Sequence, residues 1–73
     1  MNKTIINLLN TIEIAQNETI RNNALELLFD TIIETKQIKN DLLLIIDTIK
    51  HLHIQSKNIC KIIIDYCYIY INI

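Results

Sequence analysis

The 73-residue sequence contains no glycine, no proline, no tryptophan and no valine. The absence of glycine excludes the glycine-rich phosphate loop, the tight turn that presents a hydrolase serine and the EF-hand calcium loop. The absence of proline removes a common marker of helix ends, so capping side chains have to mark them instead. The chain therefore lacks the local motifs of many nucleotide-binding proteins and of several enzyme classes.

An excess of positive charge is also missing, because seven basic residues stand against eight acidic ones and the formal net charge is −1. Nucleic-acid binding depends on clustered cations that neutralise phosphates. The lysines of the second half are instead interleaved with aspartates, in the order Lys36, Lys39, Asp41, Asp47, Lys50, Lys57, Lys61 and Asp65. Nucleic-acid binding is therefore not expected, and a small helical nucleic-acid-binding dimer with Tyr66, Tyr68 and Tyr70 as stacking residues stays as a second alternative.

Long apolar runs are absent as well. The longest ones cover only residues 42–46 and 66–71, whereas a membrane-spanning helix needs about 20 apolar residues. The first residues also lack the apolar stretch of a secretory signal peptide. We therefore expect a soluble, cytoplasmic protein with no membrane span.

Isoleucine is abundant, with 19 residues, while valine is absent. Packing does not prefer isoleucine so completely, because both residues are β-branched and apolar. Residue types with A/T-rich codons number 39, against three for glycine, alanine, arginine and proline together. We infer an A/T-rich genome, so part of the isoleucine content reflects codon usage rather than structure.

Four segments carry apolar residues at the i, i+3, i+4 and i+7 positions typical of amphipathic helices. This pattern predicts an all-α protein in which four short antiparallel helices, over about 3–16, 18–35, 41–54 and 57–71, form a small bundle or compact helical array as one domain. A weak repeat of an apolar–apolar–Asx–Thr–Ile core leaves a fragment of a helical-repeat array as an alternative. Residues 66–73 also show the strict alternation of side chains that is typical of a β-strand, so an extended segment there is the alternative prediction. The predicted apolar stripes comprise Ile5, Leu8, Leu9, Ile12 and Ala15; Ile20, Ala24, Leu25, Leu28, Phe29, Ile32 and Ile33; Ile38, Leu42, Ile45, Ile46, Ile49 and Leu52; and Ile59, Ile62, Ile63, Tyr66, Cys67 and Tyr70.

Polar residues mark the predicted helix starts. Asn17 precedes Glu18, and Asn40 precedes Asp41. In both pairs the asparagine is suited to cap backbone N–H groups, and the following acid suits the positive end of the helix dipole. Ser56 is the expected cap of the last helix.

The apolar surface is larger than a small bundle needs. A chain of this size buries only about 60% of its unfolded surface, and several apolar residues lie off the main stripes, most of all in the third and fourth helices. We therefore expect a non-enzymatic protein–protein interaction module that self-associates or docks on a larger protein through apolar helix faces. The predicted interface residues are Leu43, Leu44, Ile64, Tyr68 and Ile69.

A second surface feature is an acidic ridge formed by Glu26, Asp30 and Glu34. These residues are four apart and lie on one side of the second predicted helix, where like charges repel. The ridge supports an alternative function, that of a small viral or bacterial inhibitor or immunity-type protein that neutralises a basic protein target.

The cysteines and histidines do not form a metal or catalytic motif. Cys60 and Cys67 would stand about 10.5 Å apart along a helix, too far for a disulfide, so we expect buried free thiols. His51 and His53 point in nearly opposite directions on a helix, and the spacing of all four residues differs from that of zinc sites. We therefore expect no metal, no cofactor, no catalytic residue and no small-molecule substrate.

Overall fold

The computed structural model describes residues 1–52 and 57–72. It contains four helices in these segments, and no strand is found there: α1 (Lys3–Ile14), α2 (Glu18–Glu34), α3 (Lys39–Lys50) and α4 (Lys57–Ile71). The all-α fold class is therefore confirmed. The extended alternative for the C-terminal segment is wrong, because α4 continues through Tyr66 to Ile71.

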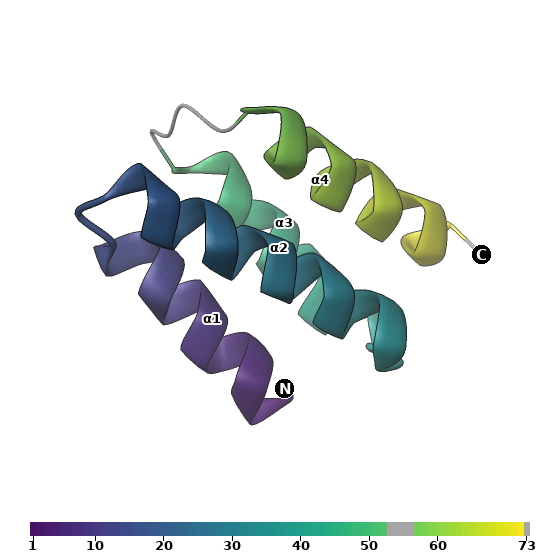
Figure 1. The fold of residues 1–73 in the computed structure, drawn as a ribbon. Helices are drawn as coiled ribbons and strands as arrows, with labels where there is room; N and C mark the ends of the chain where they lie inside the picture. Colours follow the sequence, from purple (N-terminus) through teal and green to yellow (C-terminus); the bar gives the residue numbers. More distant parts are fainter. Residues whose placement is uncertain (53–56, 73) are drawn as a thin grey trace.

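Consecutive helices run in opposite directions, so the chain forms two helical hairpins packed on each other (Figure 1). α1 packs against α2, α3 packs against α4, and α2 also contacts α4. The folded chain measures 35 × 23 × 18 Å along its principal axes. α2, the longest helix, thus has neighbours from both hairpins.

Asparagine side chains cap the first two helices. The Asn2 Oδ1 atom accepts hydrogen bonds from the backbone N–H groups of Thr4 (2.7 Å) and Ile5 (3.3 Å). At α2, the Asn17 Oδ1 atom accepts from the N–H group of Ile20 at 3.1 Å. Each bond satisfies donors that have no partner within the helix. The predicted cap at Asn17 is confirmed.

The predicted cap of the third helix is wrong. α3 begins at Lys39 with Ile38 in the N-cap position, where no side chain supplies a hydrogen bond. The Leu42 N–H group already bonds to the Ile38 carbonyl oxygen at 3.1 Å, so Asn40 lies inside the helix. Earlier backbone hydrogen bonding thus replaces the side-chain cap. α3 also ends at Lys50 rather than near 54, and the predicted cap Ser56 lies outside the described residues.

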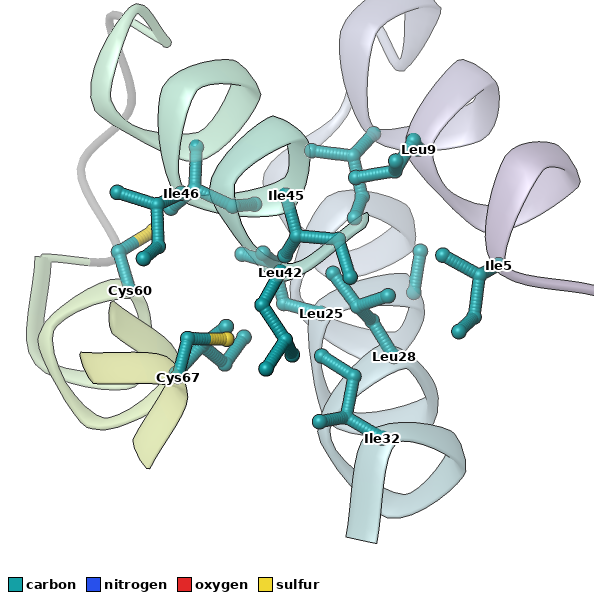
Figure 2. Packing of buried hydrophobic residues seen from close by; sticks show 14 residues of the cluster. Ile5, Leu9, Leu25, Leu28, Ile32, Leu42, Ile45, Ile46, Cys60 and Cys67 are labelled. Atoms are coloured by element: carbon teal, nitrogen blue, oxygen red, sulfur yellow. The ribbon is translucent and has the colours of Figure 1, made fainter. Parts of the chain in front are cut away.

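One apolar core joins the four helices, and Figure 2 shows its side chains converging between the two hairpins. Fully buried side chains come from every helix, including Ile5, Leu25, Ile45 and Ile63. The periodic stripes therefore predicted the centre of the core correctly. The buried core residues are Ile5, Leu9, Ile12, Ala24, Leu25, Leu28, Ile32, Leu42, Ile45, Ile46, Ile49, Cys60, Ile63 and Cys67.

The margins of the predicted stripes are exposed instead. Neighbouring helices do not cover the full width of each predicted stripe, so five stripe residues are exposed. These residues are Ile20, Ile33, Ile38, Ile62 and Tyr70. Some of the predicted core is thus surface. Within the described segments, no helix has the length and hydropathy to cross a membrane.

Candidate functional site

Four of the five predicted interface residues lie on the surface of the α3–α4 hairpin. Leu43 and Leu44 of α3 are 43% and 52% exposed, and Tyr68 and Ile69 of α4 are 39% and 59% exposed. Ile64 differs, because it is half-buried and packs against the core. Leu43, Leu44, Tyr68 and Ile69 therefore form an exposed apolar surface on α3 and α4. The Ile64 side chain packs against the core instead.

A direct contact between α3 and α4 crosses this surface. The Lys50 Nζ atom donates a hydrogen bond to the Tyr68 hydroxyl oxygen (3.0 Å) and lies 5.5 Å from the centre of the tyrosine ring. Helical side chains lean towards the N-terminus of their own helix, so these two lean towards each other from antiparallel helices. The hydrogen bond to the Tyr68 hydroxyl oxygen raises the pKa of the Lys50 ammonium group.

The Lys50–Tyr68 contact also shows how the apolar residues are distributed. Leu43 lies seven residues before Lys50 and so shares its side of α3, beside the groove between the helices. Leu44 directly follows Leu43, and Ile69 directly follows Tyr68. Each residue along a helix rotates the side-chain direction by about 100°, which turns Leu44 and Ile69 away from the groove. The surface therefore wraps from the α3–α4 groove onto the outer faces of both helices.

The acidic ridge lies on the outer side of α2. Glu26, Asp30 and Glu34 are all exposed. Glu26 and Asp30 line a shallow hollow of about 380 Å³ together with Asn23 and Leu27, and the Leu27 side chain is 56% exposed. The ridge thus combines carboxylates with an exposed apolar side chain. Glu34, at the end of the helix, belongs to a different hollow.

That second hollow is a pocket of about 480 Å³ between the end of α2, the connection to α3 and the last turns of α4. It joins apolar, aromatic and charged groups from segments distant in sequence, so local spacing did not predict it. The spacing of Tyr66 and Tyr70 places them on one helix face, but only the packing of α2 on α4 brings residues 32–37 beside them. The lining residues are Ile32, Ile33, Glu34, Thr35, Lys36, Gln37, Leu42, Tyr66 and Tyr70.

Two of the lining residues, Tyr66 and Tyr70, belong to an aromatic cluster with Phe29. The rings of Phe29 on α2 and Tyr66 on α4 meet edge to face, with centres 5.5 Å apart at 87°. The Tyr66 and Tyr70 rings lie 4.6 Å apart at 35°. Hydrogen bonding to Tyr70, together with desolvation, raises the pKa of Tyr66 to about 12. The edge-to-face contact of Phe29 with Tyr66 links α2 to α4.

The cysteines are free and buried, as predicted. Desolvation, followed by the charge of Glu18, raises the pKa of Cys60. Desolvation alone raises the pKa of Cys67 to about 11. A reactive cysteine needs the opposite shift, because the thiolate is the nucleophile. The structure therefore uses both residues as small core side chains.

The remaining polar residues form local contacts. His51 is exposed at the end of α3, where its Nδ1 atom lies 2.7 Å from the Asp47 carbonyl oxygen and 3.4 Å from the Asp47 carboxylate. Lys61 and Asp65 form an exposed ion pair of 3.7 Å on α4. Within residues 1–52 and 57–72, no three metal-ligating side chains gather at one point. His53 lies outside the described residues.

Comparisons with protein-family models, curated proteins and solved structures found no match to this chain.

Proposed function

We propose that this protein is a cytoplasmic, non-enzymatic interaction module that self-associates or docks on a larger protein through α3 and α4. The observation that supports this proposal is the exposure of Leu43, Leu44, Tyr68 and Ile69 on one hairpin. Large apolar surfaces on a soluble domain mark interaction sites. A symmetric dimer would use this surface twice, because each copy contributes the same residues.

The association is held by apolar burial rather than by charge. Fully burying a leucine or isoleucine side chain contributes about 1.5–3 kcal/mol, and this contribution is insensitive to moderate salt. Lys50 and Tyr68 bring polar groups to the same surface, and tyrosine is favoured at interfaces because its ring packs while its hydroxyl group bonds. The interface is therefore expected to persist from low to high ionic strength.

The test is size-exclusion chromatography with light scattering at low and high salt. The unchanged chain should elute as a dimer or larger species at both salt concentrations. The double variant Leu44→Lys, Ile69→Lys should be monomeric and should keep its helical circular dichroism, because both side chains point outward. The matched control, Ile14→Lys with Leu27→Lys, changes two other exposed apolar residues and should remain associated. A monomer before any substitution contradicts self-association, and docking on another protein would then be tested by capture from the native source.

A second candidate function uses the acidic ridge. Exposed Leu27 between Glu26 and Asp30 gives this ridge an apolar contact inside a negative rim, which suits a basic protein surface. An inhibitor or immunity-type protein of this kind would be monomeric alone, and its complex would weaken steeply with salt. Replacing Glu26 and Asp30 with glutamine should slow association with the target, whereas Leu44→Lys should leave it unchanged.

A further inference from the structure

The end of α2 places the Glu34 carboxylate at the negative end of the helix dipole, beside the 480 Å³ pocket. The last carbonyl groups of a helix lack partners within the helix and form the negative end of its dipole. α2 has no basic residue in its last turn, and Glu34 adds a full negative charge at this end. Asp30, one turn earlier, repels Glu34. The placement of Glu34 is thus unfavourable for α2 itself, and a bound cation would relieve it.

The aromatic residues of the pocket suit the same kind of ligand. The Tyr66 and Tyr70 rings, tilted 35° to each other, both line the pocket, and aromatic rings attract cations and flat groups. The buried side chains of Ile32 and Leu42 line the pocket beside these rings. A ligand with an apolar or planar body and a positive head would therefore contact both kinds of surface.

Glu34 and Gln37 bring acceptor oxygens to the pocket. The Gln37 Nε2 atom donates to the hydroxyl (2.5 Å) and carbonyl (3.4 Å) oxygens of Thr35. These bonds hold the amide in place and leave its oxygen as an acceptor. Lys36 is the cation among the described lining residues, and in the described part of the chain no ion pair joins it to Glu34. Its exposed ammonium group is the feature that opposes a cationic ligand.

We propose that this pocket binds an organic cation, an amine or guanidine carried on a flat or apolar body. The positive head lies by Glu34 and the α2 carbonyl groups, and the body packs on Tyr70 and Leu42. The volume falls within the range of small-molecule sites, about 300–1,000 Å³. This site is separate from the α3–α4 surface proposed for association, so either proposal can fail without the other.

Two probes of similar shape and opposite charge test the inference. Benzamidine and benzoate are titrated separately into the isotope-labelled protein, and the backbone amide signals of residues 34–37 are followed by NMR. Benzamidine should give saturable shifts at these residues and should bind more tightly than benzoate. N-acetyl-arginine amide, titrated in parallel, represents an arginine side chain of a partner protein. Tighter binding of this compound identifies a peptide source, and tighter binding of benzamidine identifies a free small molecule; both support the site.

Conservative variants separate the site from general charge effects. Glu34→Gln should weaken benzamidine binding by about threefold, the size of a helix-terminus charge effect. Glu26→Gln removes the same charge from the same helix outside the pocket and should leave the affinity unchanged. Lys36→Gln should strengthen benzamidine binding and weaken benzoate binding. Equal affinity for the two probes, preference for benzoate, an absence of saturable shifts, or equal losses from Glu34→Gln and Glu26→Gln would overturn the proposal.

Discussion

The Arg21 side chain on α2 caps the C-terminal end of α1 by hydrogen bonding to the backbone carbonyl oxygen of Ile12. The Arg21 Nε–H group donates to the Ile12 carbonyl oxygen at 3.2 Å, and the Nη2 atom donates to the carbonyl oxygen of Ala15 at 2.5 Å. The Nη1 atom pairs with the carboxylate of Glu18. α1 has no basic residue in its own last turn, so the single arginine of the chain supplies the missing positive charge from the next helix.

Replacing Arg21 with methionine should therefore destabilise the fold. The variant keeps the apolar stem of the side chain and loses the charged hydrogen bonds, each of which contributes about 1.5–3 kcal/mol. We expect the free energy of unfolding in urea to fall by about 3 kcal/mol or more, because two such bonds to carbonyl groups are lost. Arg21→Lys should recover only part of this loss, because lysine lacks the planar fork that reaches two carbonyl groups at once.

The control for this prediction is Lys61→Met. It also removes a cation from a helical ion pair, but the Lys61–Asp65 pair is exposed. Exposed pairs contribute about 0–1 kcal/mol. If Arg21→Met and Lys61→Met lower the free energy of unfolding by similar amounts, Arg21 does not cap the C-terminal end of α1.

The two asparagines at predicted helix starts should respond differently to alanine. Asn17→Ala removes the side-chain bond to the Ile20 N–H group and should lower the free energy of unfolding by about 1 kcal/mol. Asn40→Ala falls inside α3, so its effect should stay within about 0.5 kcal/mol of zero. Urea unfolding monitored by circular dichroism measures both. A loss of about 1 kcal/mol at Asn40 would indicate that α3 begins at the sequence-predicted position.

Stability should fall at alkaline pH because of the buried thiols. Burial raises the pKa of Cys67 from 9.0 to about 11, so the folded state keeps this proton over a pH range in which the unfolded state loses it. The stabilisation is complete below pH 9 and is lost as the pH rises towards 11. Cys67→Ala should flatten this decrease in the free energy of unfolding between pH 9 and 11, whatever its effect at neutral pH. An unchanged slope would assign the decrease to other groups, such as Tyr66, whose pKa is also raised.

The contact between Lys50 and Tyr68 is also testable by titration. The bond to the Tyr68 hydroxyl group raises the pKa of Lys50, so Tyr68→Phe should lower it towards its ordinary value. NMR of the lysine Cε group follows the titration directly. Tyr70→Phe removes a hydroxyl group from the same helix and should leave the pKa of Lys50 unchanged, because the Lys50 contact is made by Tyr68. Equal effects of the two variants would contradict the assignment.

Local sequence patterns predicted much of this structure. The stripes through Ile5, Leu28, Ile45 and Ile63 are buried as expected, because the period of 3.6 residues selects one side of each helix. The cap at Asn17 was predictable for the same local reason, since its bond spans three residues. The start of α3 was not, because a backbone bond from Leu42 to Ile38 competes with the cap at Asn40.

The sequence by itself determined that residues 1–52 and 57–72 form four amphipathic helices, bury their central stripes and keep both cysteines as free thiols. These outcomes depend on composition and on spacings within one helix. Only the tertiary structure decided which stripe margins stay exposed, that Arg21 caps the neighbouring helix, and that Glu34 and Lys36 meet Tyr66 and Tyr70 around one pocket. The physical reason is that these contacts join helices distant in sequence, and their geometry depends on how the helices pack rather than on any local repeat.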